Sequence, residues 1–164
     1  MTETAGQQAR TTDGDDPRLG EIGLDNFAPY LMNRIMGRYN AALRDEMAEL
    51  GLTTPQMRAL AVLSVMDGLL IRDLAVYAVV EQSTLSRALD KLARDGKIRR
   101  ESDPGDSRAV RIFLTEAGRD DYVRLWPHMA RSYRNMFRGI ETTERRVFVE
   151  TLQKILRNVR VHDF

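Results

Sequence analysis

The chain has 164 residues, of which 43% are hydrophobic and 30% are charged, which suits a single domain with a buried core. No segment approaches the roughly 20 apolar residues that span a membrane. The chain has no cysteine, which excludes disulfides, thiolate metal sites and cysteine-based sensing. The formal net charge of +1 does not by itself indicate a nucleic-acid partner.

Residues 1–24 are predicted to form a disordered acidic tail, because they are polar and lack apolar periodicity. Residues 1–26 contain six acidic and two basic side chains. The N-terminus also lacks the apolar stretch of a signal peptide, so a cytoplasmic location is expected. Residues 25–164 are predicted to form one domain.

Two helices are expected first in that domain. Helical spacing of apolar residues predicts one helix over 25–50, which Gly51 ends as a C-terminal cap. A second helix is predicted to begin at Thr53 or Thr54, with a proline early in its first turn. The Asp-Gly pair at 67–68 ends it.

A short helix over 71–78 and another over 82–94 follow. In the second of these, apolar residues at i, i+3, i+4 and i+7 form one stripe, namely Leu85, Ala88, Leu89 and Leu92. The period then changes: 97–101 and 110–114 are predicted to be strands of a β-hairpin with a turn-rich link. Long helices are expected up to about residue 138 and over 143–159.

The order of short helix, turn, second helix and hairpin favours a winged helix-turn-helix, which offers its second helix to the major groove of DNA. The stripe of that helix packs on the domain. Its other face carries side chains suited to bases and phosphates: Gln82, Ser83, Thr84, Ser86, Arg87 and Lys91. Arg87 has the geometry to bind a guanine with two hydrogen bonds or to hold a phosphate.

The hairpin is the basic part of the chain, since residues 84–111 hold eight Lys and Arg against five Asp and Glu. Arg108 lies near the hairpin tip, where it is expected to enter a minor groove, with Asp106 bracing it. Arg99 is a further candidate for DNA contact. The alternative is that Arg99 and Arg111 only pair with Glu101 or Asp103.

Three motifs together resemble the MarR family of winged helix-turn-helix regulators. They are the run from Gln82 to Leu92 followed by Asp95-Gly96, the wing segment from Asp103 to Ala109 closed by residues 114–118, and the segment from Gly51 to Met57. The resemblance spans roughly residues 25–160. Each short piece is unspecific, but their joint order and spacing are specific.

The resemblance implies a mainly α fold with a small β-hairpin wing. The winged helix-turn-helix would occupy 52–118, flanked by long dimerisation helices at 25–50 and 119–160. It also implies a homodimer that binds a pseudo-palindromic operator on double-stranded DNA, usually as a repressor. Two-fold symmetry would place the recognition helices about 34 Å apart.

The resemblance further implies a small phenolic or aromatic acid as effector. Its candidate pocket residues are Tyr30, Arg34, Arg38, Tyr39 and Arg58. The arginines are included because a guanidinium binds a carboxylate with charge-assisted hydrogen bonds. The alternative is that the tyrosines are core residues and the arginines form ion pairs between helices. Equally, a constitutive DNA-binding or architectural protein would need no ligand.

An enzyme is not expected, since the sequence has no Gly-rich phosphate loop, nucleophile elbow or HExxH motif. The two histidines, His128 and His162, are far apart, so no metal site is expected within one subunit. No cofactor is expected.

Overall fold

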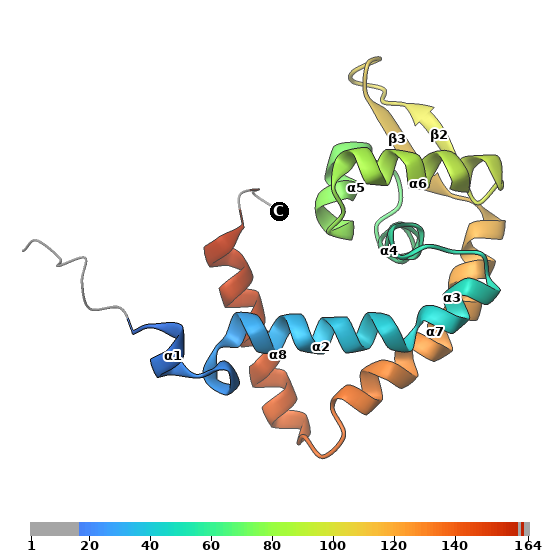
Figure 1. Ribbon diagram of the computed structural model, residues 1–164. Coiled ribbons are helices and arrows are strands. Elements are labelled where there is room, and N and C mark those ends of the chain that lie inside the picture. Colours follow the sequence, from blue (N-terminus) through green and yellow to red (C-terminus); the bar gives the residue numbers. More distant parts are fainter. Residues whose placement is uncertain (1–16, 161, 163–164) are drawn as a thin grey trace, which may run out of the picture. The chain divides into compact units, whose positions relative to one another are not determined.

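The computed structural model describes residues 17–160 and 162, and it is mainly helical with one small antiparallel sheet (Figure 1). The predicted fold class is therefore confirmed. The elements are α1 (Leu19–Ile22), η1 (Leu24–Asn26), α2 (Ala28–Ala42), α3 (Arg44–Glu49), α4 (Thr54–Leu63), β1 (Leu69–Leu70), α5 (Ile71–Ala78), α6 (Gln82–Arg94), β2 (Ile98–Ser102), β3 (Val110–Leu114), α7 (Glu116–Met136) and α8 (Thr142–Val159).

The chain divides into two units between Arg38 and Tyr39, within α2. The first unit contains α1, where Glu21 accepts a hydrogen bond from the Arg18 N–H at 3.2 Å, and the 3-10 turn η1. The sequence predicted a disordered tail up to residue 24. The structure corrects the last part of it, which forms the one-turn helix α1 and the start of η1. Residues 1–16 of that tail lie outside the described residues.

The single helix predicted over 25–50 is divided at Leu43. The Leu43 N–H bonds the Asn40 carbonyl at 3.4 Å, a tighter i→i−3 bond, and α3 then begins at Arg44. Leu43 is fully buried, and no glycine or proline marks the break in the sequence. The predicted stop at Gly51 is confirmed, because this residue has a φ of +63° and the Leu52 N–H bonds back to the Met47 carbonyl at 2.8 Å.

The helix-turn-helix consists of α5 and α6, whose bounds agree with the sequence prediction. Its turn contains Val79 at a φ of +52°, in the left-handed region that a β-branched side chain rarely adopts. The Val79 carbonyl accepts a hydrogen bond from Arg58 Nη1 on α4 at 3.0 Å. The turn is therefore held by a contact from another helix and not by its own residue preference.

Replacing Val79 with glycine is expected to stabilise the protein by about 1 kcal/mol, because the left-handed strain disappears. The side chain is 77% exposed, so little burial is lost, and the Arg58 bond is to the backbone. Val65→Gly is the matched control, since Val65 is 82% exposed but has no positive φ. In urea unfolding, the free energy of unfolding should rise for Val79→Gly and fall for Val65→Gly. A Val79→Gly variant that is less stable than the wild type would contradict backbone strain at Val79.

The predicted hairpin is present, and a short strand not foreseen from the sequence extends it. The strand order is β1-β3-β2, all antiparallel, with Leu69 opposite Ile112 on one side and Arg100 opposite Ile112 on the other. β1 was not predicted, because its two residues are too few to show an alternating pattern. It joins the start of α5 to the base of the wing.

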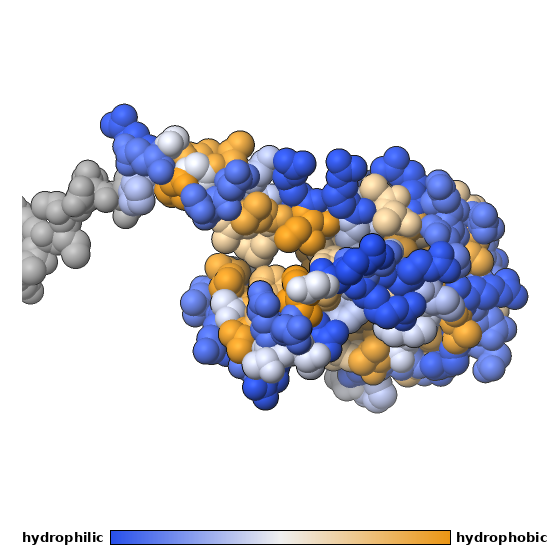
Figure 2. All heavy atoms as spheres, turned by 90° about the horizontal axis from the view of Figure 1, so that it is seen from below, coloured by the Kyte–Doolittle hydropathy of each residue, from blue (hydrophilic) through white to orange (hydrophobic). Residues whose placement is uncertain are grey.

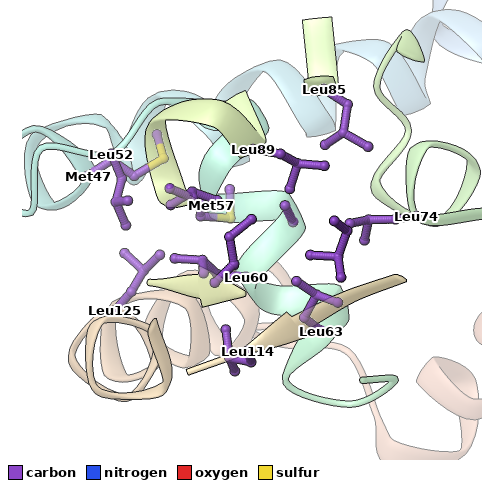
Figure 3. Packing of buried hydrophobic residues seen from close by; sticks show 14 of the residues in the cluster. Met47, Leu52, Met57, Leu60, Leu63, Leu74, Leu85, Leu89, Leu114 and Leu125 are labelled. Atoms are coloured by element: carbon purple, nitrogen blue, oxygen red, sulfur yellow. The ribbon is translucent and has the colours of Figure 1, made fainter. Parts of the chain in front are cut away.

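The hydrophobic core lies within the second unit, between α4, α6, the sheet and the first half of α7 (Figure 3). Leu60 and Leu63 on α4 are almost completely buried, as are Leu85 and Leu89 on α6. The helical stripe predicted for α6 therefore packs on the domain, as expected.

Many large apolar side chains of the two C-terminal helices remain exposed, and hydrophobic residues reach the surface among hydrophilic ones (Figure 2). On α8 they are Val147, Phe148, Val149, Ile155, Leu156 and Val159, and on α7 they are Val123, Trp126 and Tyr133. No residue of α8 is buried within the single chain. Among the described residues, no helix has the length and apolar character to cross a membrane.

Candidate nucleic-acid interface

The N-terminus of α6 is organised by Glu81. Its carboxylate accepts hydrogen bonds from the Thr84 N–H at 3.1 Å and from the Ser83 hydroxyl. These hydrogen bonds lower the pKa of the Glu81 carboxyl, and the bond from the Ser83 hydroxyl contributes more than the bond from the Thr84 N–H. Glu81 therefore caps the helix as an anion, which the helix dipole favours, and the Ser83 hydroxyl is already engaged there.

The exposed face of α6 carries the other predicted contact residues. Gln82, Thr84 and Arg87 are exposed and Ser86 is half-buried. The Arg87 guanidinium forms no hydrogen bond or ion pair with any other described residue. Lys91, in contrast, contacts both carboxylate oxygens of Asp95 at 2.8 Å and would have to exchange that pair for a phosphate.

The wing tip is shaped by two aspartates. Asp103 Oδ1 accepts hydrogen bonds from the Gly105 N–H at 2.8 Å and the Asp106 N–H at 3.0 Å. The hydrogen bond from the Gly105 N–H lowers the pKa of the Asp103 carboxyl most, and the hydrogen bond from Arg111 lowers it further. Asp106 Oδ1 in turn accepts the Arg108 N–H at 3.0 Å. Asp106 thus holds Arg108 from two residues away, through the Arg108 backbone.

Two of the wing arginines are held by carboxylates, as the alternative interpretation of the sequence proposed. Arg99 pairs with Glu101 and lies over the Phe113 ring, 4.3 Å from its centroid. Arg111 Nε contacts Asp103 Oδ2 at 2.5 Å, and its Nη1 donates to the Gly68 carbonyl at 2.8 Å. Arg111 therefore ties the wing turn to the loop before β1.

Arg108 differs from these, because its exposed guanidinium makes no hydrogen bond or ion pair within the described part of the chain. Arg100, which the sequence did not single out, pairs with Asp90 at 2.7 Å and so links β2 to α6. The wing thus contains anchored arginines at its base and one unpaired arginine at its tip.

Two shallow hollows flank α6. A hollow of about 540 Å³ lies towards the wing and includes Gln82, Ser86 and Arg108 in its lining. A second hollow, of about 380 Å³, lies towards the start of α4 and includes Thr84, Arg87 and Lys91. The predicted contact residues of α6, other than Ser83, therefore face one hollow or the other.

The predicted ligand residues fall in different units. Tyr30, Arg34 and Arg38 belong to the first, where Arg34 Nη1 donates to the Tyr30 hydroxyl at 3.0 Å. Tyr39 and Arg58 belong to the second. Burial raises the pKa of the Tyr39 hydroxyl, and Arg58 is occupied by the Val79 carbonyl. Their assignment to a pocket stays a prediction.

Comparison with known proteins agrees with this geometry. The MarR family model matches residues 50–109, which contain α4, the helix-turn-helix and most of the wing. A solved transcriptional regulator of the MarR family from Silicibacter pomeroyi is 61% identical, with a TM-score of 0.86. The alignment covers 90% of this chain and 100% of that one. The chain belongs to the MarR family.

More distant relatives are also regulators. The HTH-type transcriptional repressor IacR of Pseudomonas putida is 22% identical over 144 residues, 88% of this chain and 86% of its own length. Bordetella bronchiseptica BpsR, whose DNA binding is regulated by 6-hydroxynicotinic acid, shares the fold with a TM-score of 0.67. It is 24% identical, and the match covers 77% of this chain and 96% of BpsR. MarR-family proteins are DNA-binding transcriptional regulators and not enzymes.

Proposed function

We propose that this MarR-family regulator is a homodimeric repressor that binds a pseudo-palindromic operator and leaves it when a small aromatic or phenolic acid binds. The observation that carries the DNA-binding part is that two exposed guanidinium groups, one on each side of α6, form no hydrogen bond or ion pair with another described residue. Arg87 lies on the exposed face of α6 and Arg108 at the wing tip. A free guanidinium is the group best suited to guanine edges, phosphates and narrow minor grooves.

Dimerisation is supported by the apolar side chains that α7 and α8 leave in water. Trp126, Phe148 and Leu156 are 52%, 42% and 63% exposed in the single chain. Soluble monomers rarely expose such a series along one helix pair, and a second copy would bury it. A two-fold dimer would also present two copies of α6 to successive major grooves.

The effector is supported by the relatives. IacR is a repressor, and the DNA binding of BpsR responds to an aromatic carboxylic acid. A ligand that binds one arrangement of the two DNA-binding lobes better than the other would shift the dimer away from the DNA-competent spacing.

A constitutive DNA-binding protein is the second candidate, and one observation favours it. Two of the arginines predicted to meet a ligand carboxylate already have partners, Arg34 on the Tyr30 hydroxyl and Arg58 on the Val79 carbonyl. A ligand would have to replace these contacts.

Fluorescence anisotropy with a duplex from the promoter region of the chain's own gene tests the proposal. We expect two chains per duplex and a logarithm of affinity that falls linearly with the logarithm of salt concentration. Salicylate, benzoate and 6-hydroxynicotinate, with acetate as control, are then added to the complex. An effector should raise the apparent Kd and, without DNA, raise the melting temperature.

Each result decides between the candidates. DNA binding that an aromatic acid weakens supports the ligand-controlled repressor. DNA binding that none of the aromatic acids changes, together with an unchanged melting temperature, favours the constitutive protein. Absence of any salt-dependent binding to duplex DNA would overturn both.

A further inference from the structure

The larger hollow beside α6 contains an arginine that no sequence motif singled out. Its lining combines the start of α5, one side of α6 and the wing, and includes Arg72, Gln82, Ser86, Gly105, Arg108 and Arg111. The volume of about 540 Å³ is open to solvent and large enough for a segment of an extended polymer. Arg72 on α5 and Arg108 on the wing thus border the same space.

Two guanidinium groups in this hollow, those of Arg72 and Arg108, keep nitrogens without a hydrogen-bond partner among the described residues. Asp103 and Asp106 also line it, so three arginines face two aspartates there. Asp103 accepts wing N–H groups with Oδ1 and binds Arg111 with Oδ2, and Asp106 Oδ1 accepts the Arg108 N–H. Arg72 uses only its Nε, on Asp73 Oδ1 at 3.3 Å, and its side chain is 75% exposed. Its two terminal nitrogens have no hydrogen-bond partner among the described residues.

We propose that one sugar–phosphate strand of the bound duplex passes through this hollow and that Arg72 binds a phosphate there. The proposal rests on the DNA-binding function proposed above. When α6 lies in the major groove and the wing tip reaches the adjacent minor groove, the strand that separates the two grooves must lie between α6 and the wing. The hollow occupies that position, and the shared ligand chemistry is a phosphodiester.

Arg72 is the group that distinguishes this strand from the opposite one. Arg111 faces the same hollow, but it is committed to Asp103 and to the Gly68 carbonyl and acts as a positioning residue for the wing. Arg87 and Lys91 line the other hollow, on the opposite side of α6. Loss of Arg72 should therefore remove a contact to one strand and leave contacts to the other strand intact.

The test compares Arg72→Ala with the full-length wild-type chain on two duplexes, one that the wild type selects from a random pool and one of unrelated sequence. Because a phosphate contact is sequence-independent, affinity should fall roughly 5- to 20-fold on both at about 0.1 M salt. The slope of the logarithm of affinity against the logarithm of salt should decrease in magnitude by about 1. Arg72→Lys should keep that slope, since lysine binds phosphate as a point charge.

Arg119→Ala is the matched control, because Arg119 is exposed in the first turn of α7 and outside both hollows. It should bind DNA as the wild type does, and both variants should melt like the wild type. Methylphosphonate substitution then locates the contact: one neutralised phosphate should weaken the wild type and leave Arg72→Ala unchanged.

The two proposals fail in different ways. A wild-type chain without salt-dependent DNA binding would overturn the proposed function. A wild-type chain that binds, with Arg72→Ala equal to it in affinity and salt slope, would overturn only the assignment of Arg72. Equal loss with Arg119→Ala would show a general charge effect and would also reject the phosphate site.

Discussion

Replacing Gly118 with alanine is expected to lower the free energy of unfolding by about 3 kcal/mol. A Cβ at this position would lie 2.1 Å from the Lys97 carbonyl oxygen and 2.9 Å from a Leu114 methyl carbon. The first of these is backbone, so the clash cannot be relieved by a side-chain rotation.

The Lys97 carbonyl is also held in place. It accepts the Thr115 N–H at 3.1 Å, and the Thr115 hydroxyl donates to the neighbouring Gly96 carbonyl at 2.7 Å. The Lys97 ammonium group pairs with Asp121 on α7 at 2.5 Å, and both side chains are largely buried. A shift of this segment would break these contacts and tilt β2, so the wing would move as well.

Urea unfolding followed by circular dichroism measures the effect, and Gly37→Ala is the control. Gly37 lies inside α2, and an added methyl group there would meet open space, so alanine should be neutral or stabilising by up to about 1 kcal/mol. A Gly118→Ala variant within about 1 kcal/mol of the wild type would contradict the close approach of α7 to Lys97.

Arg87→Ala is expected to weaken binding to the selected operator about 30-fold, which corresponds to roughly 2 kcal/mol. Arg87 is exposed on α6, has no hydrogen-bond or ion-pair partner among the described residues, and lies between Thr84 and Lys91 on the side of the smaller hollow. Its removal leaves the fold intact, because the buried stripe of α6 is on the opposite face.

The pattern of the loss distinguishes the two roles open to Arg87. If the guanidinium binds a guanine edge, the alanine variant should lose affinity for the operator and keep most of its affinity for unrelated DNA. Equal losses on both duplexes would assign it to a phosphate. Anisotropy titrations at fixed salt measure these affinities, with Arg119→Ala as the control variant. Unchanged operator binding by Arg87→Ala would reject α6 as the recognition helix.

Much of the helix-turn-helix followed from local pattern. The stripe from Leu85 to Leu92 and the Asp95-Gly96 stop predicted α6 within its observed bounds, because helix period and capping are encoded locally. The β2–β3 hairpin was predicted for the same reason. The resemblance to the MarR family was also visible in the sequence, since the residues that carry it form contiguous segments.

The tertiary structure decided which charged side chains are free to bind. Arg99, Arg108 and Arg111 look alike in the sequence, yet Glu101 and Asp103 engage the first and last and only Arg108 is unpaired. Arg58, a candidate ligand residue in the sequence, also donates a hydrogen bond to the Val79 carbonyl, which holds the turn before α6. The sequence left two interpretations open for Arg99 and Arg111, DNA contact or pairing with Glu101 and Asp103. The strand register and the fold decide between them.

The helix α6 and the hairpin were thus determined by the sequence itself, because a helical stripe and a change to strand alternation are local patterns. The break at Leu43, the strand β1 and the place of Arg72 were decided only by the fold. Each depends on contacts between residues far apart in the chain. Arg72 and Arg108 are separated by more than 30 positions, and only packing of α5 against the base of the wing places them around one hollow.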